Sequence, residues 1–494
     1  MSLTRRGLVG GLAALTVGLT AGIAAPALAE TKKKKKKPAR KPAKKPAVKP
    51  APVVLGTAEE IVAAAGLSGM VSYVLADRAT GAILEQRDAD RPMPPASTAK
   101  TLTTIYALAA LGQDYRFTTD LLPLGPVSGG RVSGGLLLAG GGDPTLSTDD
   151  LGDMVAELAA RGVKGTDGRF GVWGGALPYL PSIDPGQPCW MGYDPSVGGL
   201  NLNFNRVNLS WEPGGTAMAF DARGERFAPA TGIAAISAEA RESPLFTCDA
   251  GGGAERFTVA APALGRAGSR WLPVRRPDLY AGDVFRTLAA AQGIGLPAPE
   301  RMATPASATP LVRHQSAPLG TILRDMLKYS TNMTAEAVGM TASASVGVIG
   351  HDASAASMSQ WVSRQIGGVG GHLVDHSGLG PASRVTAAGM ARALGTLGPK
   401  VGLPGFLKEM RIEAAADRAA PQRVVAKTGT LDFVSGLVGY LTTATGQERV
   451  FAIYAADLPR HDAVTLAQAE APPGLSAWLG RARRMQTQLL QVWG

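Results

Sequence analysis

Three short motifs, far apart in the chain, constrain the fold more than any other feature. They are Ser97-Thr98-Ala99-Lys100, Ser330-Thr331-Asn332 and Lys427-Thr428-Gly429, and each of the patterns SxxK, SxN and KTG occurs once in the 494 residues. Ser97 and Ser330 are separated by 233 positions. A chain that uses the three motifs together must bring distant segments into one cleft, around a long intervening region.

The first motif places a hydroxyl and an amine on one face of a helix. Residues 101–111 are mostly apolar and lack glycine and proline, which predicts a buried helix that begins near Ser97. Positions three apart share a helix face, so the Lys100 amine should lie beside the Ser97 hydroxyl. A serine hydroxyl is a weak nucleophile until a base takes its proton, and a lysine can be that base when its pKa is lowered. A helix N-terminus and a second cation, Lys427, would both lower it.

The other two motifs supply the remaining groups of an acyl-transfer site. Ser330 can pass a proton to a leaving nitrogen, and Asn332 can bond a substrate amide or hold Lys100 in place. Lys427 offers positive charge to a terminal carboxylate. Ser97, Lys100, Ser330, Asn332 and Lys427 are therefore the predicted catalytic residues.

The segment that follows Lys427 is predicted to bind substrate. Thr428, Gly429 and Thr430 come directly after it, and the two threonine hydroxyls are further donors for a carboxylate. The backbone N–H groups of Ser97, at a helix start, and Thr430, on a strand edge, are the expected oxyanion hole. This chemistry requires no metal and no cofactor.

Each motif also has a purely structural interpretation when it stands alone. SxxK can be a helix start with serine as N-cap, SxN a cap followed by a turn, and KTG a strand that runs into a glycine turn. Because all three are unique and in order, we favour the catalytic interpretation. No GxSxG or HExxH pattern offers a rival, and His376, in Asp375-His376-Ser377-Gly378, is interpreted as a loop residue.

The two ends of the folded region are predicted to form one α/β domain. Thr57 and Glu60 have the spacing of a capping box, and a hairpin of strands 71–76 and 82–86 follows. Near the C-terminus come strands 423–427, 436–442 and 449–456 and an amphipathic helix at 475–492. Helical patterns also occur at 279–291 and 319–327.

A β-rich insertion is predicted between these ends. From about residue 117 the chain is rich in glycine, with short strand-like runs at 135–139, 170–173, 200–208 and 256–260. We therefore divide the chain into a signal peptide (1–29), a linker (30–56), a catalytic domain (57–116 and 276–494) and an insertion (117–275). Cys189 and Cys248 can form a disulfide or remain two free thiols, and the spacing supports both.

The net charge of +11 comes from the N-terminal region. Residues 1–50 hold 13 of the 50 Lys and Arg but one acid, which leaves the remainder near neutral and excludes a nucleic-acid binder. Arg5-Arg6, an apolar run and Ala27-Leu28-Ala29 predict export to the periplasm or cell envelope, and the arginine pair indicates the twin-arginine route. The Lys/Pro/Ala-rich linker is either a spacer or a loose contact to anionic wall polymer or membrane.

With its three motifs, the chain resembles the D-alanyl-D-alanine carboxypeptidase and endopeptidase family, the low-molecular-mass class C penicillin-binding proteins. Two further stretches, Gly141-Gly142-Asp143-Pro144-Thr145-Leu146 and Leu200-Asn201-Leu202-Asn203-Phe204-Asn205, resemble signatures of that family's inserted domains. The resemblance covers roughly residues 57–494. It implies a DD-peptidase/β-lactamase-like fold, an antiparallel sheet flanked by helices, with a large insertion.

The resemblance also implies a reaction. Ser97 would attack the carbonyl of the penultimate D-alanine of a peptidoglycan stem peptide, form an acyl-enzyme and pass the acyl group to water. β-Lactam antibiotics would be covalent inhibitors at Ser97. The chain departs from the family pattern where Pro381 replaces an expected arginine, and where an expected acidic residue before Tyr193 has only Asp184 as a weak match.

Two other functions are weighed against this one. A β-lactamase would need a rapid deacylation step, and the chain has no ExxLN pattern between Ser330 and Lys427. A non-catalytic wall-binding protein would have no chemical use for the intact motifs. The balance between carboxypeptidase and endopeptidase activity, the stem peptide preferred and the oligomeric state are left open by the sequence.

Overall fold

The computed structural model describes residues 54–249, 255–303 and 307–494. The predicted signal peptide, 1–29, and all but the last three residues of the predicted linker, 30–56, lie outside the described residues. Within the described ranges, no helix is both long and apolar enough to cross a membrane. The first helix, α1 (Ala58–Ala64), begins at the predicted capping box of Thr57 and Glu60.

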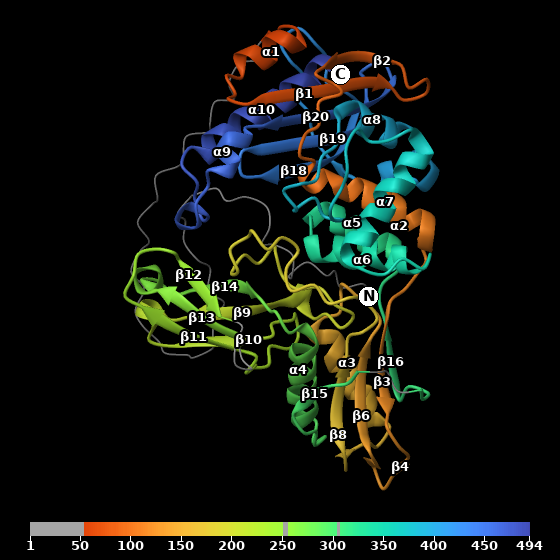
Figure 1. The fold of residues 1–494 in the computed structure, drawn as a ribbon, viewed down its shortest axis with the longest axis vertical. Coiled ribbons are helices and arrows are strands. Elements are labelled where there is room, and N and C mark those ends of the chain that lie inside the picture. Colours follow the sequence, from red (N-terminus) through yellow and green to blue (C-terminus); the bar gives the residue numbers. More distant parts are fainter. Residues whose placement is uncertain (1–53, 250–254, 304–306) are drawn as a thin grey trace, which may run out of the picture.

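One antiparallel sheet joins the two ends of the described chain (Figure 1). Its order is β17-β18-β19-β20-β1-β2. The strands are β1 (Met70–Asp77), β2 (Ile83–Arg87), β17 (Lys408–Glu409), β18 (Arg423–Leu431), β19 (Val434–Thr442) and β20 (Glu448–Ala456). The register pairs Tyr73 with Ile453 and Lys427 with Val438. The predicted hairpin and the three C-terminal strands are confirmed, and β18 continues past its predicted end at Lys427.

The sheet carries a hydrophobic core on each face, as the alternation of side chains along a strand requires. On one face, Leu437 and Phe451 pack with Trp478 of α10 (Leu475–Trp493) and with α1. On the other face, Val438 and Ala452 pack against a helical layer. The helices of that layer are α2 (Ala99–Leu111), α5 (Leu319–Tyr329), α6 (Asn332–Ala344), α7 (His351–Ile366) and α8 (Ala387–Thr396). A short helix, α9 (Leu458–Asp462), follows β20. The expected sheet flanked by helices is therefore confirmed.

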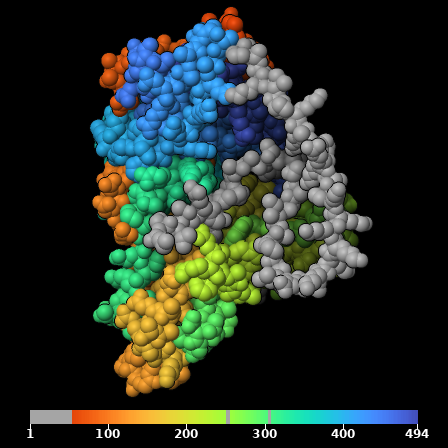
Figure 2. Space-filling model, turned by 180° about the vertical axis from the view of Figure 1, so that it is seen from behind, coloured from red at the N-terminus to blue at the C-terminus, as the bar shows by residue number. Residues whose placement is uncertain are grey.

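The inserted region forms a second lobe, below the first in Figure 1 and seen from behind in Figure 2. A five-stranded sheet, β15-β8-β6-β3-β16, packs on α3 (Thr148–Ala160) and α4 (Pro277–Ala291). Its strands are β3 (Thr118–Pro123), β6 (Gly135–Gly140), β8 (Arg169–Trp173), β15 (Pro299–Arg301) and β16 (Val312–Gln315).

Three small sheets complete this lobe. They are β4 (Val127–Ser128) with β5 (Arg131–Val132) and β7 (Gly165–Thr166), β9 (Arg206–Trp211) with β10 (Met218–Asp221) and β14 (Gly268–Pro273), and β11 (Ala234–Glu239) with β12 (Phe246–Asp249) and β13 (Glu255–Ala260).

The structure moves one predicted boundary. We expected the catalytic domain to resume at residue 276, but α4 packs into the core of the inserted lobe through Tyr280, Val284 and Phe285. The strands β15 and β16 pair with β8 and β3 of the same lobe. The helix predicted at 279–291 is confirmed as α4. An amphipathic pattern does not show, however, which hydrophobic core the apolar face of the helix joins.

A second correction concerns residues 200–208, predicted as one strand. The strand begins only at Arg206, and Asn203, Phe204 and Asn205 have positive φ angles of 49°, 57° and 51°. Asparagine side chains stabilise this turn by replacing strand hydrogen bonds: Asn205 Oδ1 accepts from Leu202 N at 2.9 Å, and Asn203 Oδ1 accepts from the Thr148 backbone at 3.1 Å. The alternating apolar pattern concealed a tight turn.

The inserted lobe touches the catalytic part at the start of α6. Leu177 and Val197 of the insertion form a small core with Met333 and Ala337 of α6. The disulfide between Cys189 and Cys248 lies within the inserted lobe and links the segment before Trp190 to β12. Of the two alternatives that the sequence left open, the structure shows the pair.

We predict that the double variant Cys189→Ser/Cys248→Ser unfolds at a lower temperature than the wild type. The disulfide spans 59 positions, and the loop-closure entropy of such a loop corresponds to roughly 2–4 kcal/mol of stability. Thermal melts with and without dithiothreitol should show a loss in the wild type under reduction and no further loss in the variant. Two free thiols titrated in the denatured, unreduced wild type would contradict the pairing.

Candidate active site

The first motif lies where the chain turns into α2. Residues Ala96–Thr98 form one turn of 3-10 helix, and Lys100 is in the first turn of α2. The Lys100 side chain is fully buried, and its Nζ lies 2.9 Å from Ser97 Oγ. The predicted pairing of the two groups on one helix face is therefore present.

The second motif forms the corner between α5 and α6. Ser330 ends α5 in the left-handed conformation (φ 61°, ψ 37°), and Asn332 is the first residue of α6. Lys100 Nζ donates to Asn332 Oδ1 at 2.7 Å. Asn332 Nδ2 in turn donates to the carbonyl of Tyr193, from the inserted lobe, at 2.9 Å. Asn332 thus holds Lys100 and ties the insertion to the site.

The third motif lies on β18, opposite the corner. The Lys427 side chain is buried, and its Nζ donates to Ser330 Oγ at 2.9 Å and to the Thr428 carbonyl at 2.7 Å. Thr428 and Thr430 alternate with it along the strand and are exposed. The five predicted catalytic residues therefore meet at one place. They form two hydrogen-bonded groups: Lys100 contacts both Ser97 and Asn332, and Lys427 contacts Ser330.

Gly429 allows β18 to lie against the turn that carries Ser97. A Cβ at this position would be 2.8 Å from the Pro95 carbonyl oxygen and 3.1 Å from Thr98 Cγ2. Backbone contact of this kind excludes any larger residue without movement. The glycine of KTG is therefore a close-approach position inside a strand, and the alternative of a strand that ends in a glycine turn is wrong.

Burial sets the charge of both amines. It lowers the pKa of Lys100 to about 7, although the carboxylates of Asp375 and Glu336 act to raise it. Burial also lowers the pKa of Lys427 well below its usual value, and the nearby charge of Lys100 adds to this effect. Lys100 can accordingly exist as a neutral amine near pH 7, which is the form that can accept a proton from Ser97 Oγ.

The sequence did not indicate the groups behind Lys100. The third contact of its Nζ is the carbonyl of Ser377, at 2.8 Å. Ser377 belongs to the turn that follows Asp375 and His376, and both of these side chains are fully buried. His376 is thus more than an ordinary loop residue, since Nε2 lies 2.7 Å from Ser354 Oγ. In the sequence, the polar run Asp375-His376-Ser377 was the only indication of these buried groups behind Lys100.

The two departures noted in the sequence have defined surroundings. The carboxylate of Asp184 is bonded within its own loop, to Gly186 N at 3.0 Å and Gln187 Nε2 at 2.8 Å. Pro381 is exposed, and its carbonyl accepts from the guanidinium of Arg384 at 2.5 Å. The carboxylate of Asp184 therefore stabilises its own loop. At the position where an arginine was expected, Pro381 is in contact with Arg384.

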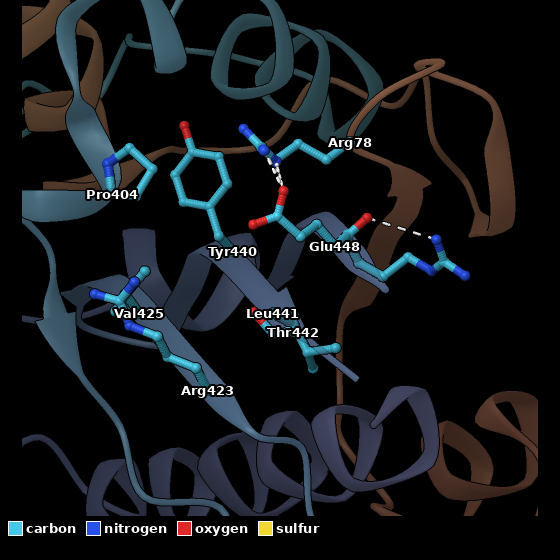
Figure 3. Close-up of a pocket in the computed structure, with 9 residues that line it drawn as sticks. Arg78, Pro404, Arg423, Val425, Tyr440, Leu441, Thr442 and Glu448 are labelled. Atoms are coloured by element: carbon cyan, nitrogen blue, oxygen red, sulfur yellow. Dashed lines mark hydrogen bonds and ion pairs between the residues drawn. The ribbon is translucent and has the colours of Figure 1, made fainter. Parts of the chain in front are cut away.

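One hollow in the described structure lies apart from this site. Figure 3 shows it on the catalytic sheet, lined by side chains that include Arg423, Tyr440 and an ion pair of Arg78 with Glu448. None of the predicted catalytic residues lines it. Within the described ranges, no group of three or more His, Cys, Asp or Glu side chains is placed to hold a metal ion.

Comparisons with known proteins find relatives over most of the chain. The model of the D-Ala-D-Ala carboxypeptidase 3 (S13) family matches residues 56–472. Carboxypeptidase Rv3627c of Mycobacterium tuberculosis is 30% identical over 412 residues, which are 79% of this chain and 77% of that protein. The D-alanyl-D-alanine carboxypeptidase of Actinomadura sp. (strain R39) is 27% identical over 431 residues, 77% of each chain.

A solved structure shows the same fold. Penicillin binding protein 4 of Haemophilus influenzae superposes with a TM-score of 0.70 at 19% identity, over 88% of this chain and 100% of that one. Because the family model spans most of the chain and the relatives align over three quarters of it, the chain belongs to the D-Ala-D-Ala carboxypeptidase 3 (S13) family of peptidases.

Proposed function

We propose that this peptidase is a serine DD-carboxypeptidase and DD-endopeptidase that acts on peptidoglycan stem peptides through an acyl-enzyme at Ser97. The observation that carries the proposal is the fully buried Lys100 amine, 2.9 Å from Ser97 Oγ and with a pKa lowered to about 7. A neutral amine at that distance can take the hydroxyl proton as the oxygen attacks a carbonyl.

The remaining motif residues complete the acylation step. The backbone N–H groups of Ser97 and Thr430 would bind the oxyanion of the tetrahedral intermediate. Ser330, bonded to Lys427, would pass its proton to the departing nitrogen and take in its place the proton that Lys100 removed from Ser97. The C–N bond then breaks, a neutral amine leaves and Lys100 is neutral again. For a carboxypeptidase this amine is terminal D-alanine, and for an endopeptidase it belongs to a neighbouring stem peptide.

Lys427, Thr428 and Thr430 are proposed to bind the terminal carboxylate. In the free enzyme, burial favours the neutral form of Lys427. A carboxylate that enters the cleft compensates the cost of a buried ammonium group, and so would restore the charge of Lys427. Water then attacks the acyl-enzyme, with Lys100 again as base, and Ser97 is regenerated.

β-Lactams are proposed to acylate the same serine. The Haemophilus influenzae protein has been solved in complex with a β-lactam, with a TM-score of 0.67 to this chain. The chain lacks an ExxLN pattern after Ser330, so a slow release of the acyl group is expected, unlike that of a β-lactamase.

Export is part of the same proposal. The Cys189–Cys248 disulfide is typical of proteins that fold outside the cytoplasm, and stem peptides are found there. We place the enzyme in the periplasm or cell envelope, reached by the N-terminal signal and the twin-arginine route. The Lys-rich segment would add a loose attraction to anionic wall or membrane.

We predict that fluorescent penicillin labels the wild-type protein covalently and that Ser97→Ala abolishes the label. The matched control is Ser345→Ala, an exposed hydroxyl at the end of α6, which should label like the wild type. Gel fluorescence after denaturation reads the covalent product. Labelling that persists in Ser97→Ala would place the nucleophile elsewhere.

We expect Lys427→Ala to lower the rate of D-alanine release by about 100-fold, because a charge-assisted bond to the terminal carboxylate is lost. The melting temperature of the variant should change little. Burial of the Lys427 amine is itself unfavourable, as its lowered pKa indicates, so its removal offsets the loss of its hydrogen bonds. Lys408→Ala, on the exposed edge strand β17 of the same sheet, is the control. Equal losses of activity and stability would make Lys427 a structural residue.

Purified muropeptides test the two proposed activities directly. We expect the monomeric pentapeptide to lose one alanine and the cross-linked dimer to be cut into monomers, both measured by mass spectrometry and both absent in Ser97→Ala. A dimer that stays intact would remove the endopeptidase activity. Two intact substrates beside a penicillin-labelled enzyme would favour the wall-binding alternative.

A further inference from the structure

A cluster of acidic and histidine side chains lies buried directly behind Lys100. Glu336, Asp375 and His376 are fully buried, and the side chain of His351 is 12% exposed. A buried carboxylate is costly unless it is paired and hydrogen-bonded. The predicted mechanism uses none of these four groups, so their burial beside the catalytic amine needs an explanation.

Glu336 is the centre of this cluster. It lies one helical turn after Asn332 on α6, so the two side chains share a face of the helix. Oε1 accepts from the backbone N–H of Ser377 at 2.8 Å, and Oε2 accepts from the backbone N–H of His376 at 3.0 Å. His351 Nε2 lies 3.0 Å from the same Oε2. One carboxylate thus holds two successive peptide groups and one imidazole.

The peptide groups that Glu336 holds belong to the turn that contacts Lys100. The carboxylate of Asp375 fixes the far side of this turn by accepting from Gly378 N at 2.9 Å and Gly380 N at 2.6 Å. A Cβ on Gly378 (φ 76°) would collide with the carbonyl oxygen of Ala96, beside the nucleophile. These contacts hold the turn from both sides, and its Ser377 carbonyl accepts from Lys100 Nζ at 2.8 Å.

His351 balances the charge of Glu336. Burial alone would raise the pKa of Glu336, but the hydrogen bond from His351 and the positive charge of that imidazole hold it well below its usual value. Burial alone would likewise lower the pKa of His351, but Glu336 raises it to about 9. Near pH 7 the two are a carboxylate and an imidazolium, with no net charge. Burial lowers the pKa of His376 to about 4, so this ring is neutral.

We propose that Glu336 and His351 are positioning residues for Lys100: Glu336 holds the turn whose Ser377 carbonyl receives the catalytic amine, and His351 neutralises the charge that Glu336 places behind it. The inference rests on the proposed role of Lys100 as base. It assigns to a second pair of side chains the task of keeping that base neutral and aimed at Ser97.

The two residues should act on Lys100 in opposite directions. The carboxylate of Glu336 raises the pKa of Lys100, so its removal lowers that pKa. In His351→Gln the N–H groups of His376 and Ser377 still hold Glu336 as a carboxylate. This negative charge is then no longer compensated by an imidazolium, so the pKa of Lys100 rises. The other titratable groups that face Lys100 are Asp375, from the turn, and Lys427, from β18, and both residues are retained in the test variants. Burial and the charge of Glu336 raise the pKa of Asp375 to about 6, so Glu336→Gln also favours the ionised form of Asp375.

The test is the pH dependence of acylation by fluorescent penicillin, measured from about pH 5 to pH 9 on the full-length protein. The base must be neutral, so the wild-type rate should rise with pH through an apparent pKa near that of Lys100, about 7. This rising part of the pH–rate profile is the limb that the variants should shift. We expect Glu336→Gln to move the limb to lower pH and His351→Gln to move it to higher pH, each by roughly 0.5–1 pH unit. The double variant should return toward the wild-type limb.

The height of the profile reports the positioning role. A glutamine at 336 faces one backbone N–H with an amide NH₂, so the Ser377 carbonyl moves and the plateau rate should fall by about tenfold. Asp352→Asn is the control: this carboxylate lies 3.5 Å from His351 Nδ1 but is fully exposed, so solvent screens it and the limb should not move. Thermal melts of all variants check that they fold.

The outcomes separate this inference from the proposed function. If the wild type is not labelled at Ser97, the proposed function fails. If the wild type is labelled and the limbs of Glu336→Gln and His351→Gln superimpose on its own, the inference fails while the function stands. Limbs that shift in the same direction would also overturn it, because a general loss of structure cannot produce opposite shifts.

Discussion

The structure depends on the burial of one amine. Lys100 Nζ has three hydrogen-bond partners: Ser97 Oγ in the 3-10 turn before α2, Asn332 Oδ1 at the start of α6 and the Ser377 carbonyl in the turn after Asp375. A lysine without access to water is unfavourable as a cation, and these partners fix its position without fully restoring the energy of hydration. The same burial that costs stability gives an amine that can act as a base near pH 7, so the fold and the proposed chemistry have one physical origin.

Glycines make this convergence sterically possible. Gly429 lets β18 lie against the turn at Pro95, and Gly378 lets the 375–380 turn lie against Ala96. A third, Gly339 on α6, leaves room for the ring of His376, which a Cβ would strike. At Gly429 and Gly378 the backbone of another element occupies the space that a Cβ would need, and this brings groups that lie hundreds of positions apart close together.

Most of the catalytic sheet could be predicted from the sequence, because its strands alternate and its hairpins are local. The pairing of Ser97 with Lys100 could also be predicted, since helix geometry alone sets it. The attachment of α4 to the inserted lobe could not, because an amphipathic pattern does not name its partner. The turn at Asn203–Asn205 was hidden by an apolar alternation, and its asparagines were the overlooked signal. Glu336 was missed for another reason. It binds backbone N–H groups of a loop 40 positions away, and backbone groups leave no pattern in a sequence.

In the proposed reaction, two buried amines at one site also couple substrate binding to activation of the nucleophile. The charge of Lys100 acts on Lys427, and electrostatic coupling is mutual, so a proton on either amine disfavours a proton on the other. In the proposed reaction, a substrate carboxylate at Thr428 and Thr430 stabilises the proton on Lys427. Lys100 is then left neutral beside Ser97, at the moment when a carbonyl is in place to be attacked. A ligand that lacks the carboxylate would not provide this bias. In the proposed reaction the site would therefore select a carboxylate through the protonation of its base as well as through contact.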